Sequence, residues 1–207
     1  MRRVKQTVDR TWEPGCLVKW TFQGLSNEDR FGLLFEDVEG SEFRLATGAM
    51  GASRYSYALA LGVEPEEINN VWANALINPL DPVTVESAPC QEVVRTGDDI
   101  KLSDLPIPTW TPGKDPSPYI TTSVATRDPD TGNQNMGVYR TRVRDDQHVV
   151  VNLNPRRHGA DQISAWLNQG KPAPVAWVIG AEPAVHYASV GAVQAGVQEI
   201  AVAGGLM

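Results

Sequence analysis

The residues best suited to chemistry are three side chains that lie far apart in the sequence. Asn135 offers a neutral amide oxygen, His158 a neutral ring nitrogen and Glu199 an anionic carboxylate. Together they would suit a fairly hard divalent ion such as Mn²⁺ or Mg²⁺, particularly if a phosphate completes the coordination shell. Spacing alone does not establish this set, because three residues so far apart can be chosen in many ways.

Arginines close to these residues could bind an anion. Arg140, Arg156 and Arg157 could hold a phosphate, and glycine-rich turns would let backbone N–H groups approach it. No Walker A, Rossmann or Gly-x-Ser-x-Gly motif is present. A simpler interpretation stays open for Asn135 and Arg140: an asparagine at a rim, and an arginine on an edge strand that reaches water with its charge.

The other histidines and the cysteines have simpler interpretations. His148 opens an apolar run and fits a rim position, and His186 lies in an alanine-rich segment where packing is the commoner role. Cys16 and Cys90 have no metal-binding spacing. We interpret them as reduced packing residues of a cytoplasmic protein.

Composition limits the class of protein. The chain has 207 residues, of which 42% are hydrophobic and 21% charged, as in ordinary soluble globular proteins. The net charge of -7 argues against nucleic acid or an anionic membrane as a partner. No apolar run is long enough to cross a membrane, and no apolar stretch follows the basic N-terminus, so we expect no signal peptide.

A β-hairpin is expected around the first candidate ligand. Asp128–Gly132 has turn chemistry and separates two β-prone runs, Ile120–Thr126 and Met136–Val143. Because side chains alternate between the faces of a strand, Asn135 and Arg140 should lie on opposite faces.

The remaining elements follow from periodicity and capping. Ser53 can cap a helix over residues 54–61, and Asp161 can cap another whose apolar positions are Ile163, Trp166 and Leu167. The clearest helix starts near Pro65 and is broken by Asn78–Pro82, which we take as a boundary between domains at 1–80 and 81–207. Further strands are expected at Phe31–Phe35, Phe43–Thr47, Val83–Glu86, Cys90–Val94, His148–Leu153, Val175–Ile179 and Val197–Val202, the last of which carries Glu199.

Several stretches together resemble the UbiD family of prenylated-flavin-dependent (de)carboxylases. They occur in the family's order along nearly the whole chain, so their joint match is highly specific. The stretches are Leu33–Gly40, Leu102–Trp110, Tyr119–Thr122, Asp128–Gly132, Asn135–Arg140, Arg157–Gly159, Gly180–Pro183 and Glu199–Leu206.

The resemblance implies an α+β fold, in which a small N-terminal α/β domain precedes a partial, flavin-reductase-like split β-barrel. It also implies prenylated FMN and Mn²⁺ as cofactors, and it admits K⁺ as a further ion. Asn135, His158 and Glu199 match the family's metal ligands, which hold Mn²⁺ against the flavin phosphate. Arg140 matches the arginine of the family's Glu–Arg–Glu catalytic set. Further cofactor contacts implied are Thr122, Arg157, Ser189 and Val190.

The activity implied is non-oxidative (de)carboxylation of an aromatic or α,β-unsaturated carboxylic acid through an adduct with the prenylated flavin. The family's two catalytic glutamates lie beyond the position of Met207. The chain is therefore expected to be a fragment, one subunit of a split enzyme, or a protein that has lost activity. We expect it to associate with a complementary chain or with itself. A non-catalytic scaffold subunit is the main alternative, and an ordinary flavin reductase ranks last because no nicotinamide fingerprint is present.

Overall fold

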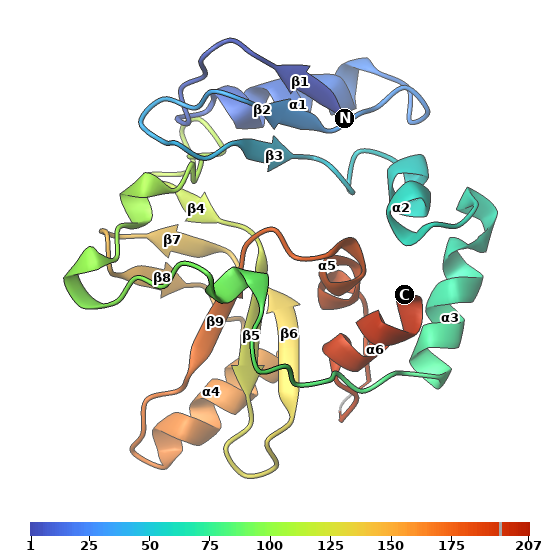
Figure 1. Cartoon of the computed structure of the whole chain (residues 1–207), viewed down its shortest axis with the longest axis vertical. Coiled ribbons are helices and arrows are strands. Elements are labelled where there is room, and N and C mark those ends of the chain that lie inside the picture. Colours follow the sequence, from blue (N-terminus) through green and yellow to red (C-terminus); the bar gives the residue numbers. More distant parts are fainter. Residues whose placement is uncertain (195) are drawn as a thin grey trace. The chain divides into compact units, whose positions relative to one another are not determined.

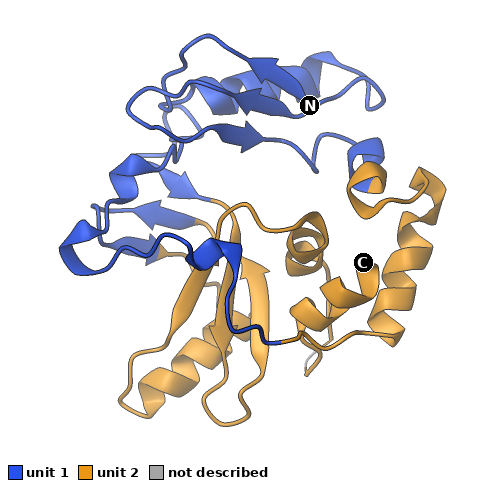
Figure 2. Cartoon of the chain, viewed as in Figure 1, with its two compact units in different colours: residues 1–57, 84–120, 141–150 blue, residues 58–83, 121–140, 151–207 orange. Residues whose placement is uncertain are grey.

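The computed structural model describes residues 1–194 and 196–207, which form helices and small sheets (Figure 1). The chain divides into two compact units, each assembled from three separate segments (Figure 2). The first unit consists of residues 1–57, 84–120 and 141–150, and the second of residues 58–83, 121–140 and 151–207. The α+β class is confirmed. The predicted boundary at residue 80 divides the sequence into two continuous domains, whereas each of these units combines separate segments. That boundary stays a prediction.

The N-terminal sheet of the first unit has the strand order β1-β2-β3. β1 (Arg2–Val4) runs parallel to β2 (Leu33–Phe35), and β2 pairs antiparallel with β3 (Leu45–Thr47). A parallel pair needs a long crossover, and α1 (Glu13–Gly24) lies in that connection. The predicted strands at 31–35 and 43–47 are thus present in shortened form, and Phe35 is fully buried in the small core beneath them.

A second sheet has the order β4-β7-β8. It contains β4 (Tyr119–Ile120), β7 (Thr141–Val143) and β8 (Val149–Val151), and β4 pairs antiparallel with β7. The β8 strand covers the middle of the run predicted at 148–153.

Two predicted strands are absent from the described part of the chain. Val83–Glu86 and Cys90–Val94 form no strand; short 3₁₀ turns occupy Pro89–Gln91, Gly97–Asp99 and Leu102–Asp104 instead. A β-prone run becomes a strand only when another strand pairs with it, and none of the described residues does so here.

The sheet of the second unit contains the predicted hairpin. β5 (Ser123–Arg127) pairs antiparallel with β6 (Gln134–Val138) on one side and with β9 (Val175–Val178) on the other. In the turn, Asp128 Oδ1 accepts hydrogen bonds from the backbone N–H groups of Asp130 and Thr131. This is the turn chemistry expected of an aspartate at that position.

Helices supply most of the second unit's core. They are α2 (Arg54–Leu61, which crosses the unit boundary), α3 (Ile68–Ile77, preceded by a 3₁₀ turn at Pro65–Glu67), α4 (His158–Asn168), α5 (Pro183–Val190) and α6 (Glu199–Leu206). Ser53 Oγ accepts a hydrogen bond from Ser56 N at 3.2 Å, as expected of a cap of α2. α4 begins at His158 with Arg157 as its N-cap, four residues before the cap predicted at Asp161. Small buried residues of α3, α5 and α6 pack together in the core: Ala75, Ala184, Ala188, Val202, Ala203 and Leu206.

The last predicted strand is wrong, because Glu199 begins helix α6 instead. Val197–Val202 is a short apolar run, and periodicity cannot distinguish a buried strand from a buried helix. The following glycines allow the helix to pack closely against the end of α3. A Cβ atom on Gly204 would lie 2.6 Å from Leu80 O, and one on Gly205 would lie 2.8 Å from Asn78 O.

The interpretation of the cysteines as packing residues is also wrong. Cys16 and Cys90 are both free and exposed. Cys16 lies on the outer part of α1, and Cys90 lies in the exposed segment that forms no strand. The sequence analysis predicted neither α1 nor the 3₁₀ turn at Pro89–Gln91, so it did not show that both cysteines lie at the surface.

Candidate functional site

A cavity of about 560 Å³ lies within the second unit. Its wall is built by the end of β6 and the residues after it, by the loop before α4, by the C-terminal end of α5, and by the first residue of α6. Seven of the eight predicted site residues line this cavity: Asn135, Arg140, Arg157, His158, Ser189, Val190 and Glu199. Residues from four separate segments of the sequence therefore come together, while their chemical roles stay predictions.

Glu199 reaches the cavity because it covers the open edge of β6. Among the strands formed by the described residues, β6 is the outer one of its sheet, so its outward N–H groups have no strand partner there. Gln134 N donates to Gln198 Oε1 at 3.1 Å, and Met136 N donates to Glu199 Oε2 at 2.8 Å. The start of α6 thereby satisfies two alternate groups of this edge. Glu199 is 6% exposed, and the positive end of the helix dipole favours its charge.

His158 and Glu199 are close enough to share a ligand. His158 Nδ1 lies 4.0 Å from Glu199 Oε1, and the His158 side chain is 43% exposed while that of Glu199 is 8% exposed. Two atoms that each bind a small divalent ion at about 2.1 Å can be no more than about 4.2 Å apart. The observed separation is thus compatible with a shared ion.

Asn135 is held with its amide nitrogen turned toward protein groups. Nδ2 donates to Thr126 Oγ1 at 3.2 Å and to Tyr139 Oη at 3.4 Å. Thr126 is the direct partner of Asn135 across the β5–β6 pair, so the two side chains share a face of the sheet. Because the nitrogen is committed to these bonds, the carbonyl oxygen is the atom of Asn135 that remains suited to a cation.

The donor set fits a hard divalent ion in chemical type. It combines an amide oxygen, an imidazole nitrogen and a carboxylate, which suit Mn²⁺ or Mg²⁺ better than a soft metal. Among residues 1–194 and 196–207, no three His, Cys, Asp or Glu side chains form a group that could hold a metal. The predicted set would not count as such a group, because only His158 and Glu199 belong to these four residue types and its third member is Asn135.

Arg140 lies just beyond β6, which ends at Val138, and it is exposed. The expected strand over Met136–Val143 is therefore interrupted at Tyr139 and Arg140, and the exposed Arg140 agrees with the simpler interpretation of an arginine that reaches water with its charge. Its backbone is anchored nonetheless, because Arg140 O accepts a hydrogen bond from Asn152 N at 3.0 Å. This hydrogen bond holds the backbone of Arg140 in place, and the Arg140 side chain forms part of the cavity wall.

The loop before α4 brings two more arginines to the cavity. Arg156 has a φ of 71°, a left-handed conformation that is uncommon for a residue with a side chain. Arg157 follows as the N-cap of α4, and His158 is the first helical residue. The strained backbone thus places two cations and a candidate ligand at one helix start, a common location for anion binding.

Thr122 is the predicted site residue that does not line the cavity. Its Oγ1 donates a hydrogen bond to Val178 O on the neighbouring strand β9. The next residue, Ser123, is fully buried and instead contacts Ser189 on α5. A shift of one position along an extended chain reverses the face of the side chain, so these two neighbours have different partners. The cofactor contact expected of Thr122 stays a prediction.

The two other histidines largely follow their simple interpretations. The side chain of His148 is exposed, and its Nδ1 lies 2.7 Å from Asp145 Oδ1. His186 packs in α5, where burial lowers its pKa below the ordinary value of 6.5. Tyr139, Asn152 and Asn154 also line the cavity and were not singled out from the sequence.

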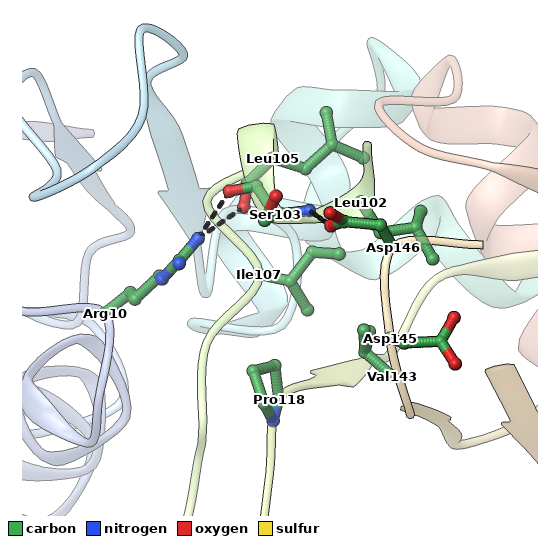
Figure 3. A pocket seen from close by; sticks show the side chains of 9 residues that line it. All are labelled: Arg10, Leu102, Ser103, Leu105, Ile107, Pro118, Val143, Asp145 and Asp146. Atoms are coloured by element: carbon green, nitrogen blue, oxygen red, sulfur yellow. Dashed lines mark hydrogen bonds between the residues drawn. The ribbon is translucent and has the colours of Figure 1, made fainter. Parts of the chain in front are cut away.

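The first unit contains a separate cavity of about 320 Å³, and Figure 3 shows its largely aliphatic wall. Its polar groups are occupied by internal bonds. Arg10 Nη1 donates to Ser103 O at 2.8 Å and to Leu105 O at 3.1 Å, and Asp146 Oδ1 accepts from Ser103 N at 2.9 Å. These bonds hold the turn at residues 102–104 in place, so we assign this cavity a structural role.

The fold and the larger cavity define an α+β protein whose cavity brings arginine side chains together with a candidate set of cation ligands. The model of the UbiD 3-octaprenyl-4-hydroxybenzoate carboxy-lyase Rift-related domain matches residues 82–207. The chain belongs to the UbiD family.

Solved structures of UbiD-class enzymes and related decarboxylases resemble the chain over its whole length. An evolved dimeric form of HmfF from Pelotomaculum thermopropionicum, solved in complex with prFMN, is 33% identical with a TM-score of 0.88 and matches 100% of this chain. Vanillic acid decarboxylase from Sedimentibacter hydroxybenzoicus is 27% identical with a TM-score of 0.86, and 3,4-dihydroxybenzoic acid decarboxylase from Enterobacter cloacae is 29% identical with a TM-score of 0.82; each matches 99%.

The chain spans about half the length of these structures: 47% of HmfF, 44% of the vanillic acid decarboxylase and 45% of the Enterobacter enzyme. None of the helices formed by residues 1–194 and 196–207 has the length and apolar character needed to cross a membrane.

Proposed function

We propose that this chain is the cofactor-binding portion of a UbiD-like carboxy-lyase that acts on a small aromatic or α,β-unsaturated carboxylic acid. The proposal rests chiefly on the common cavity of Asn135, His158, Glu199 and Arg140. It is supported by family membership and by relatives solved with prFMN and FMN. A cytoplasmic location is part of the same proposal.

In this proposal, Asn135, His158 and Glu199 hold Mn²⁺, and Arg157 pairs with the phosphate of prenylated FMN. Arginine suits this role because its planar group of N–H donors matches phosphate geometry and stays charged. Ser189 and Val190 would form the adjoining wall for the cofactor. K⁺ stays a prediction without assigned ligands.

Arg140 would act on the reacting groups themselves. Its guanidinium can bind a carboxylate in two hydrogen bonds and hold it in one orientation in the cavity. Prenylated FMN, when bound, would supply the electron sink needed when CO₂ leaves an unsaturated carbon. A removal of Arg140 should therefore impair turnover more than it impairs folding.

The proton donor is proposed to come from outside this chain. Replacement of CO₂ by hydrogen requires an acid close to the carbon. Among the described residues that line the cavity, Glu199 alone carries a carboxylate, and the proposal commits it to the metal. A complementary polypeptide would then supply the acid, and a second copy of this chain is the alternative partner.

The test is to co-express the chain with a flavin prenyltransferase and record its absorbance spectrum and its affinity for Mn²⁺. We expect a bound flavin spectrum that depends on Mn²⁺. The Glu199→Gln variant keeps an acceptor for Met136 N but loses the charge, so Mn²⁺ affinity should fall by at least about tenfold.

Glu66→Gln is the matched control, because Glu66 is exposed in the same unit and lies outside the cavity. It should bind Mn²⁺ like the unmodified chain. A colourless protein, or one whose Mn²⁺ affinity is the same in both variants, would overturn the proposal and favour a scaffold subunit that retains only the fold.

A further inference from the structure

A closed ring of hydrogen bonds lies behind one wall of the cavity. Ser189 Oγ donates to His186 O at 2.8 Å within α5. Ser123 Oγ, on β5, lies 2.9 Å from Ser189 Oγ and 3.3 Å from His186 Nδ1. Ser123 is 0% exposed and Ser189 7% exposed, so water does not readily replace these partners. Only Ser189 of the three lines the cavity.

Proton counting gives this ring one direction. A carbonyl oxygen only accepts, so the single hydroxyl proton of Ser189 is used on His186 O. Ser123 must then donate its own proton to Ser189. With that proton used, Ser123 can only accept from His186, which therefore carries a proton on Nδ1.

We propose that His186 is a positioning residue that acts through Ser123 to make Ser189 an acceptor toward the cavity. Because its own proton is engaged, Ser189 can offer a ligand only its remaining lone pair. An N–H or O–H group of a ligand would be bound at this wall, whereas a phosphate or carboxylate oxygen would be repelled.

Where it concerns the cofactor, this inference rests on the proposed function. It predicts which part of the flavin cofactor lies against Ser189. The arginines of the lining, Arg140, Arg156 and Arg157, attract anionic groups, while Ser189 accepts only donors. A ribityl hydroxyl or a ring N–H of the flavin would therefore lie against Ser189, and the phosphate would lie elsewhere in the cavity. Burial also lowers the pKa of His186, which favours the neutral ring.

The direction of the ring can be tested without any cofactor. A long-range ¹H–¹⁵N spectrum of the unmodified chain above pH 7 distinguishes a protonated from an unprotonated ring nitrogen of His186. We expect the neutral tautomer with its proton on Nδ1. A proton on Nε2 would overturn the proposal, and this result would leave the proposed function standing.

Binding of FMN tests the consequence for the cavity. His186→Asn places an amide N–H near the position of Nδ1 and should keep FMN affinity within about twofold. His186→Gln carries the same amide one bond further out, so it should lose the donation to Ser123 and weaken FMN binding by about three- to tenfold.

Equal FMN affinities of the two variants, both folded, would contradict the positioning role. Failure of the unmodified chain to bind FMN or prFMN would count against the proposed function, while the tautomer experiment would still decide the direction of the ring.

Discussion

Two glycines make room for a tyrosine in the cavity wall. A Cβ atom on Gly137 would lie 2.8 Å from Tyr139 Oη, and one on Gly159 would lie 2.7 Å from the same atom. Tyr139 Oη in turn accepts a hydrogen bond from Asn135 Nδ2. The absence of two side chains thus places an aromatic ring where it orients a candidate metal ligand.

Gly159→Ala should displace this ring. The added methyl group would require Tyr139 to move, because the ring is also in close contact with Gly137. We expect the free energy of unfolding to fall by about 1 kcal/mol, as in other overpacked sites. Urea denaturation measures this change.

Tyr139→Phe supplies the control for that experiment. It removes the oxygen that lies closest to the new methyl group, so the double variant should lose less stability than the sum of the two single changes. Strictly additive losses would show that Gly159 does not act through Tyr139.

At the scale of elements, the site depends on how α6 meets the edge of β6. Gln198 and Glu199 bond to alternate N–H groups of that edge, and the glycines of α6 let it approach the end of α3. The position of Glu199 therefore depends both on these hydrogen bonds and on helix packing at the far end of α6. A substitution at that end of α6 should therefore move Glu199 and alter the cavity.

Gly205→Ala tests this dependence. Its Cβ atom would lie 2.8 Å from Asn78 O and 3.1 Å from Ala75 Cα, both of which are backbone atoms. α6 would have to shift, and we expect a loss of about 1–3 kcal/mol in the free energy of unfolding. Mn²⁺ affinity, measured by titration calorimetry, should fall with it.

Gly24→Ala is the corresponding control in another helix. Gly24 is the last residue of α1, and nothing lies within 4 Å of its added Cβ atom. Stability should stay the same or rise slightly, by up to roughly 1 kcal/mol. If Gly205→Ala behaved like this control, the close approach of α6 to α3 would not position Glu199.

At the scale of the molecule, the first unit carries apolar residues that no described segment covers. Val85, Val93 and Val94 are 63%, 76% and 72% exposed, and they lie in the β-prone runs that form no strand. Exposed apolar residues in a segment without a strand partner favour association with another chain. Chains of relatives that match this one are about twice as long.

We therefore expect the 207-residue chain to self-associate through this segment when no complementary polypeptide is present. Val93→Asp combined with Val94→Asp should shift sedimentation velocity profiles toward the monomer over a concentration series. Leu59→Asp is the control, because Leu59 is 85% exposed but lies in α2. A shift of equal size in the control would show that any exposed apolar residue suffices.

The local elements of the fold were largely predictable. The Asp128–Gly132 turn, the capping of α2 by Ser53 and the helix after Pro65 depend on contacts between residues close in sequence. Strand pairing was not predictable in the same way. Val83–Glu86 and Cys90–Val94 have the composition of strands but lack a partner, and the apolar run at 197–202 could be buried as a strand or as a helix.

By itself, the sequence determined which donors the site contains, since the types of Asn135, His158, Glu199 and the arginines are properties of single residues. It also determined the family, because the motifs recur in order along the chain. Only the tertiary structure decided that these donors meet in one cavity, that Ser123 and His186 lie behind Ser189, and that Glu199 arrives on a helix. The reason is physical: these contacts join segments far apart in sequence, and their geometry is set by packing and by the need to satisfy the edge of β6.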